Sequence, residues 1–206
     1  MSYAERTRRP PRTPTERELK KILKVTGEAK SGFRDHMIIS LALGCGLRES
    51  EIVALDVGDV ATEKDIHKPR RIVQLRVFKR AGKGAGAEPD FQRVHLPDAT
   101  YYKLTKYLKQ FDESDRRGPL FWSKKGNRLS TRRLRAMWRN WQIAADFDQL
   151  YPFHSLRHAA ITNVKRATGD IRIAQRFARH VNIQTTIIYD HPGDDELSIA
   201  TKDLLA

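Results

Sequence analysis

Most of the chain repeats its apolar residues at the three- and four-residue spacing of amphipathic helices. Thr13-Pro14-Thr15-Glu16 offers a cap, a first-turn proline and a capping-box glutamate, and it is followed by an apolar stripe that includes Leu19 and Ile22. The same spacing predicts further helices from residue 33 to the glycines at 44 and 46, over 47–55, around 104–111 and 134–141, and as three short helices in the last third of the chain.

The spacing changes between residues 72 and 96. Residues 72–78 and 93–96 are rich in β-branched and aromatic side chains, and the glycine-rich stretch 82–89 between them predicts a hairpin with a long tip. The sequence therefore predicts an α+β fold that is mostly α-helical, with a small antiparallel β-sheet. We expect all of these elements to share one core.

The charge balance points to a polyanionic partner. The 206 residues include 39 Lys or Arg and 25 Asp or Glu, which gives a formal net charge of +14. Cations laid against phosphates release condensed counterions, so nucleic acid is the leading partner, although a merely basic surface would give the same balance. Residues 1–12 carry four arginines around Pro10-Pro11 and little to bury, which is typical of a disordered basic arm.

Composition also excludes several classes of protein. Cys45 is the single cysteine, which rules out an internal disulfide and a cysteine-rich zinc site. The chain has no apolar run of the length that a membrane span needs, and residues 1–6 lack the apolar core of a signal peptide. We therefore expect a cytoplasmic protein that is not inserted in a membrane.

Two segments place cations beside chain reversals. In Gly46-Leu47-Arg48-Glu49-Ser50-Glu51, Glu51 lies on the same helical face as Arg48 and can orient its guanidinium. In the second segment, His154 and Arg157 are one helical turn apart and can face one pocket. Each segment alone also fits a plain surface: an exposed Arg–Glu pair in the first, and a satisfied histidine beside a surface arginine in the second.

A third segment completes a recognisable order of residues. His180 precedes a predicted turn, and Tyr189 follows nine positions later in Thr185-Thr186-x-x-Tyr189-x-His191. An arginine box, then His-x-x-Arg, then His and Tyr in this order resembles the tyrosine recombinases, also called phage integrases. Arg157 and His180 are 23 positions apart, as in the Xer-type members, and the resemblance runs from about Thr13 to the carboxyl end.

The resemblance implies a tyrosine-recombinase catalytic fold and a mechanism of DNA breaking and rejoining. Tyr189 would attack the scissile phosphate and leave a 3′-phosphotyrosyl link and a free 5′-hydroxyl. Arg48 and Arg157 would stabilise the negative charge that the phosphate gathers, because guanidiniums bind it bidentately and stay charged. His154 would bind the phosphate or accept the tyrosine proton, and His180 would donate to a non-bridging oxygen.

The leaving 5′-oxygen needs a proton, which a lysine of the β-hairpin supplies in this family. Lys79 and Lys83 compete for that role here, and the other one would contact a phosphate. The family's chemistry uses no metal, ATP or other cofactor, so none is expected.

The resemblance also implies partners. Double-stranded DNA is the expected substrate, and Arg132, Arg135 and Arg139 on one helical face are candidate DNA contacts. The segment after Tyr189 is expected to dock on a neighbouring subunit, so that a tetramer assembles on DNA and exchanges strands through a Holliday junction. Residues 13–206 would form the catalytic domain, and the family's usual N-terminal DNA-clamping domain is expected to be absent.

Two other functions fit parts of the same pattern. A topoisomerase of the same chemistry would relax DNA without exchanging strands, but the Xer-like spacing favours a site-specific recombinase. A catalytically silent DNA-binding protein of the same fold would explain the basic surface, but it has no need of every catalytic group. One departure from the family is that Ala178-Arg179 stand before His180, where members usually have Leu-Gly.

Overall fold

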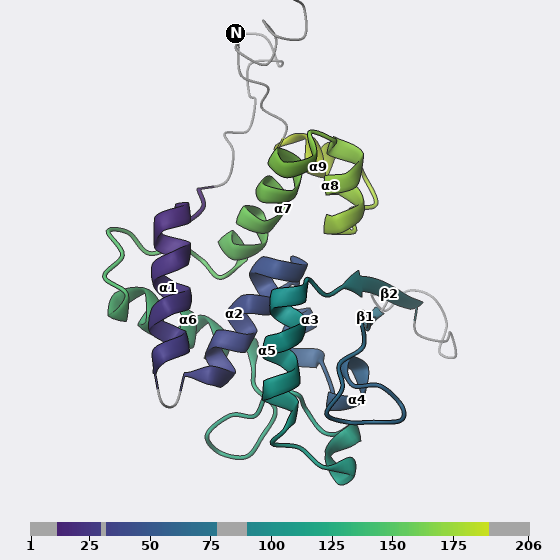
Figure 1. The fold of residues 1–206 in the computed structure, drawn as a ribbon. Coiled ribbons are helices and arrows are strands. Elements are labelled where there is room, and N and C mark those ends of the chain that lie inside the picture. Colours follow the sequence, from purple (N-terminus) through teal and green to yellow (C-terminus); the bar gives the residue numbers. More distant parts are fainter. Residues whose placement is uncertain (1–11, 30–31, 78–89, 190–206) are drawn as a thin grey trace, which may run out of the picture. The chain divides into compact units, whose positions relative to one another are not determined.

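The computed structural model describes residues 12–29, 32–77 and 90–189 (Figure 1). In chain order its elements are α1 (Glu16–Glu28), α2 (Phe33–Cys45), α3 (Glu49–Ala54), α4 (Val57–Val60), β1 (Ile72–Val77), β2 (Asp90–His95), α5 (Asp98–Leu108), the 3-10 helix η2 (Glu113–Arg117), α6 (Thr131–Ala144), α7 (His154–Thr168), α8 (Ile171–Ala178) and α9 (Gln184–Ile187). The described residues therefore confirm a mostly helical α+β fold with one small antiparallel sheet. None of the described helices has the length and the apolar run that a membrane crossing requires.

The chain forms two compact units. The larger unit is Arg12–Ala160, and the structure describes residues 161–189 of the smaller one, so the division falls within α7. Among the described residues, the buried apolar side chains form two clusters, one in each unit. The expectation of one shared core is therefore wrong: the cluster of the smaller unit consists of Ile161, Ala174, Ala178 and Tyr189.

Helix α2 is central to the larger unit because its middle turns are buried on every side. Met37, Ile38 and Ile39 are consecutive along the chain, so they point in different directions around the helix, and all three are 0% exposed. Accordingly, α1, α3 and α5 all pack against α2, and α6 packs against α1 and α3.

The first helix begins two residues later than the sequence pattern suggested. Thr15 caps it: its hydroxyl accepts a hydrogen bond from the backbone N–H of Glu18, whose carboxylate accepts one from the backbone N–H of Thr15. Thr13 and Glu16 have the same spacing as Thr15 and Glu18, so the sequence offers two capping boxes in succession. The structure uses the second one.

The two strands pair antiparallel from Ile72↔His95 to Val77↔Asp90. Val73 and Val94 are buried on one face of the sheet, which packs against α4 through β1. The described part of β1 agrees with the prediction up to Val77, and Phe78 lies outside the described residues; β2 already includes Asp90, three residues before the predicted start at residue 93.

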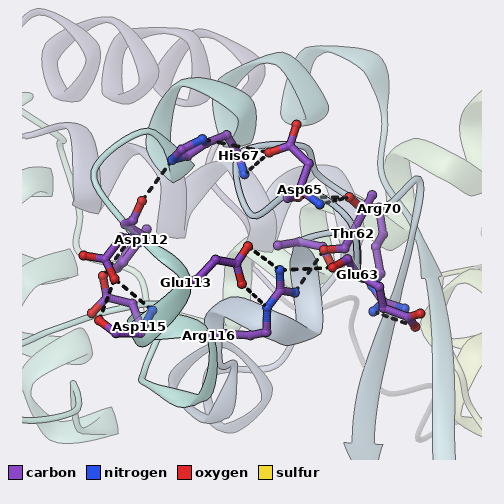
Figure 2. Close-up of polar contacts among 12 residues, drawn as sticks. Thr62, Glu63, Asp65, His67, Arg70, Asp112, Glu113, Asp115 and Arg116 are labelled. Atoms are coloured by element: carbon purple, nitrogen blue, oxygen red, sulfur yellow. Dashed lines mark hydrogen bonds and ion pairs between the residues drawn. The ribbon is translucent and has the colours of Figure 1, made fainter.

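A polar network ties η2 to the loop before β1 (Figure 2). Arg116 binds the Glu113 carboxylate with two nitrogens, Nε to Oε2 at 2.7 Å and Nη2 to Oε1 at 2.8 Å. It also donates to the backbone carbonyls of Thr62, at 3.0 Å, and Glu63, at 3.4 Å. These contacts fix the loop to η2, so the Arg116–Glu113 pair has a structural role.

Candidate active site

Arg48, the first arginine, is held by Glu51 of the same sequence segment. Gly46 ends α2 in the left-handed conformation (φ 59°), and Arg48 follows as the N-cap of α3. Glu51 Oε2 accepts a hydrogen bond from the backbone N–H of Arg48, and Oε1 accepts one from its Nη1, both at 2.7 Å. Glu51 therefore fixes both the backbone and the guanidinium of Arg48, in the contact that the sequence spacing predicts.

The second arginine comes from α7 and reaches the same place in the larger unit. Arg157 is 2% exposed, so the alternative of a surface arginine is wrong. Its Nη1 donates a hydrogen bond to the carbonyl of Gly46, two residues before Arg48. Segments more than 100 positions apart in the chain thus bring two guanidiniums to one region, and the turn at Gly46 is the shared anchor.

The first histidine lies within the field of both arginines. His154 is exposed at the start of α7, one turn before Arg157. Partial desolvation lowers its pKa, the positive charges of Arg157 and Arg48 lower it further, and Glu49 and Glu51 act in the opposite direction. The neutral imidazole therefore persists to lower pH than in an ordinary histidine.

The second histidine and the tyrosine belong to the smaller unit. His180 follows Arg179, which ends α8, and its Nδ1 is 2.9 Å from the hydroxyl oxygen of Thr186. Tyr189 lies just after α9, is 7% exposed and belongs to the apolar cluster of this unit. The rings of His180 and Tyr189 are stacked, with centroids 6.5 Å apart and planes 23° from parallel.

The predicted site residues thus fall into two groups, one in each unit. Arg48, His154 and Arg157 gather in the larger unit, and His180 and Tyr189 gather in the smaller one. The two candidate lysines of the hairpin, residues 79 and 83, lie outside the described residues. Within the described ranges, no three His, Cys, Asp or Glu side chains come together in a way that could hold a metal ion.

The three arginines proposed for DNA contact occupy the exposed side of α6. Arg132, Arg135 and Arg139 are exposed, whereas Leu134 and Trp138 on the same helix are buried.

The structure adds a residue that the sequence analysis did not single out. Glu49 accepts hydrogen bonds from Arg135 Nε, at 3.1 Å to Oε1 and 2.9 Å to Oε2, and from its Nη2. The two residues are 86 positions apart, so only the position of Glu49 beside Arg48 could have drawn attention to it.

Comparison with known proteins shows which family this chain resembles. Residues 12–196 match the phage integrase family. Tyrosine recombinase XerC of Caldanaerobacter subterraneus subsp. tengcongensis is 31% identical over 186 residues, which cover 87% of this chain and 47% of that protein. XerC of Chromobacterium violaceum is 28% identical over 166 residues, which cover 81% of this chain and 50% of that one. The chain thus spans about half the length of these relatives.

Solved structures show the same fold. The crystal structure of XerA recombinase superposes with a TM-score of 0.70 at 27% identity, covering 93% of this chain and 63% of that one. A pre-cleavage complex of XerH site-specific recombinase with its difH substrate also gives a TM-score of 0.70, at 19% identity, covering 95% of this chain and 55% of that one. The match to the family model extends over most of the chain, from before α1 to beyond Tyr189. This chain belongs to the phage integrase family.

Proposed function

We propose that this chain is the catalytic part of a site-specific tyrosine recombinase that breaks and rejoins double-stranded DNA. The observation that carries the proposal is the meeting of two distant arginine segments, in which the buried Arg157 binds the carbonyl of Gly46 beside Arg48. Two guanidiniums held in place and a histidine beside them suit a phosphodiester whose non-bridging oxygens gain charge during attack. The XerC relatives and the XerH–DNA complex support the same function.

In the proposed reaction, the Tyr189 oxygen forms a bond to phosphorus and the bond from phosphorus to the 5′-oxygen breaks. The tyrosine proton passes to a base, and His154 suits this role because its lowered pKa keeps it neutral at neutral pH. The leaving 5′-oxygen takes a proton from Lys79 or Lys83. His180, stacked on Tyr189, would donate to a non-bridging oxygen. Attack by a 5′-hydroxyl on the phosphotyrosine reverses these steps and rejoins the strand.

The test is covalent capture on DNA. Nicked duplexes of randomised sequence trap an enzyme that cleaves, because the short fragment beyond the nick diffuses away. We expect an adduct that survives denaturant and is unaffected by a chelator. Tyr189→Phe should abolish the adduct, whereas Tyr102→Phe, a matched change at a tyrosine that is 63% exposed, should leave it intact. Substitution of Arg48 or Arg157 by Gln should slow adduct formation by about 10²–10³-fold, the loss seen when a transition-state donor is removed.

The same experiment separates the recombinase from the silent DNA-binding protein. Duplex binding without any adduct would establish the silent protein and refute catalysis. A topoisomerase would form the adduct and relax supercoiled plasmid but leave no exchanged strands between two labelled duplexes. A recombinase gives both the adduct and the exchanged product.

We further propose that the carboxyl-terminal segment joins subunits into a tetramer on DNA. The segment lies outside the described residues, and its sequence supports the proposal: Leu197, Leu204 and Leu205 supply apolar contacts among acidic residues. A chain ending at residue 191 should bind DNA one protomer at a time, whereas the full chain should assemble cooperatively in a gel-shift titration. Unchanged cooperativity after truncation would refute this role.

A further inference from the structure

One ion pair lies beside the candidate phosphate site without serving the catalytic groups directly. Arg135 binds both oxygens of the Glu49 carboxylate. The Arg135 side chain is 63% exposed and that of Glu49 is 21% exposed. Arg132 and Arg139, on the same exposed side of α6, have no carboxylate partner among the residues that the structure describes. Of these three candidate DNA contacts, Arg135 is thus the one already bound to a carboxylate of its own chain.

The Arg116–Glu113 pair shows what a purely structural pair looks like in this molecule. Figure 2 shows Arg116 bound to its carboxylate and to the backbone of a neighbouring loop, and its side chain is only 24% exposed. The Arg135 side chain, in contrast, has Glu49 as its one hydrogen-bond partner within the described ranges. Solvent screens the exposed guanidinium of Arg135, so this pair is weak enough for a phosphate to replace the carboxylate.

The position of Glu49 beside Arg48 determines how the replacement of its carboxylate by a phosphate would affect DNA binding. Glu49 is the first residue of α3, directly after Arg48, and its negative charge reaches His154, where it opposes the lowering of the pKa by desolvation and by Arg157 and Arg48. A carboxylate at this point repels an approaching phosphate as long as its charge is not compensated. Arg135 supplies that compensation, but while it does so it is withheld from DNA.

We propose that Glu49 is an intramolecular competitor of DNA: it holds Arg135 as a phosphate would, and DNA must displace it before Arg135 joins the interface. The inference rests on the DNA-binding part of the proposed function and adds a residue that sets the affinity. A duplex that does not displace Glu49 from Arg135 is therefore bound more weakly. A duplex that does displace it gains one more contact between a phosphate and an arginine.

The test is a double-mutant cycle on DNA affinity. The wild-type chain, Glu49→Gln, Arg135→Gln and the double variant are titrated with a 30-base-pair duplex of mixed sequence at several salt concentrations. Glu49→Gln should tighten binding by about 5–10-fold near 0.1 M salt and steepen the salt dependence by about 0.9 in log–log slope, which corresponds to one more phosphate contact. Arg135→Gln in the wild-type background should change the affinity less than about 2-fold, and in the Glu49→Gln background it should remove the gain.

The matched control is Glu113→Gln. It makes the same change in net charge and breaks the same kind of pair, but Arg116 keeps its bonds to the carbonyls of Thr62 and Glu63. Its DNA affinity should stay at the wild-type level. An equal gain in Glu113→Gln, or a gain in Glu49→Gln that persists after Arg135→Gln, would show that lost negative charge alone is responsible and would overturn the proposal.

The covalent-capture assay keeps this proposal separate from the catalytic one. If the wild type forms the Tyr189 adduct but Glu49→Gln shows no gain that depends on Arg135, the competitor role is wrong and the recombinase stands. A gain that depends on Arg135 without any adduct would support the competitor role and refute catalysis. If Arg135→Gln fails to fold, the salt slopes of wild type and Glu49→Gln still decide, because an unchanged slope means that no cation was released.

Discussion

The two units hold their share of the candidate catalytic groups in different ways. In the larger unit, Arg157 is buried and bound to the carbonyl of Gly46, and Arg48 is fixed by hydrogen bonds, so these charges are set in a frame built over a large apolar cluster. In the smaller unit, Tyr189 is itself one of the four buried apolar residues that cluster among the described residues, and His180 stacks against it. The arginines of the larger unit are thus held by polar contacts, whereas Tyr189, the candidate nucleophile, lies among the buried apolar side chains of the smaller unit.

Within the described ranges the cluster of the smaller unit has far fewer members than that of the larger unit, so this difference predicts where the molecule is vulnerable. Loss of one side chain from the larger cluster leaves many neighbours in place around the arginines. Loss of one from the smaller cluster removes a large part of the described apolar packing around Tyr189. If the units are independent, a change made in one of them should leave the other unaffected.

The largest effect is expected from truncating each core. Ile161 and Leu108 are both 0% exposed, in the smaller and the larger cluster respectively, and each change to Ala should cost about 3 kcal/mol of stability. Ile161→Ala should lower hydrogen-exchange protection within residues 161–189 and reduce formation of the Tyr189 adduct, with protection of residues 12–160 retained. Leu108→Ala should lower hydrogen-exchange protection within residues 12–160 and leave that of residues 161–189 unchanged. Equal loss of protection over both ranges after Ile161→Ala would contradict the division into two units.

A smaller effect, confined to the larger unit, is expected on acidification. His36 is 7% exposed, and burial, followed by the charge of Lys103, lowers its pKa from 6.5 to about 4. As the pH falls, the His36 imidazole takes up a proton in the unfolded chain before it does so in the folded one. The contribution of neutral His36 to the free energy of unfolding is therefore fully present above pH 6.5 and is lost as the pH falls toward 4. The shift sets an upper limit of about 3 kcal/mol, and we expect about 2 kcal/mol.

Tryptophan fluorescence measures this acid effect selectively, because all three tryptophans of the chain lie in the larger unit. Urea unfolding followed by fluorescence should give a free energy that decreases between pH 6.5 and 4. His36→Gln keeps a donor for Thr26 but cannot titrate, so its curve should be flatter over this range. A wild-type curve as flat as that of His36→Gln would show that His36 is not buried as a neutral group.

Sequence reasoning succeeded where the determining interactions are local. The capping pattern and apolar spacing of α1 and the alternation in the hairpin involve near neighbours in the chain, and these elements were predicted to within a few residues. The turn that follows His180 and the contact between Arg48 and Glu51 are local in the same sense.

The features that were missed depend on partners far apart in the chain. Glu49 binds Arg135 across 86 positions, and Arg157 binds Gly46 across 111. No spacing rule relates such residues, because the fold alone brings them together. The division into two clusters was missed for the same reason: the apolar pattern of α7 predicts a helix with a buried stripe but does not say which residues pack against each half.

The smallest effect, and the sharpest test of independence, concerns the turn before His180. Arg179 ends α8 with φ 56° and ψ 41°, the left-handed conformation that costs a side-chain-bearing residue about 1–2 kcal/mol and that glycine adopts freely. Glycine also loses more entropy on folding, so Arg179→Gly should stabilise the smaller unit by a net amount of about 0.5–1 kcal/mol. Hydrogen exchange should slow within residues 161–189 while fluorescence-detected unfolding stays unchanged.

Asp146→Gly is the matched control in the larger unit. Asp146 has a φ of 52°, but aspartate tolerates this conformation and the change removes a contact with Lys21, so little net gain in stability is expected. Faster exchange within residues 161–189 in Arg179→Gly would mean that the arginine side chain contributes more to the turn than its backbone strain costs.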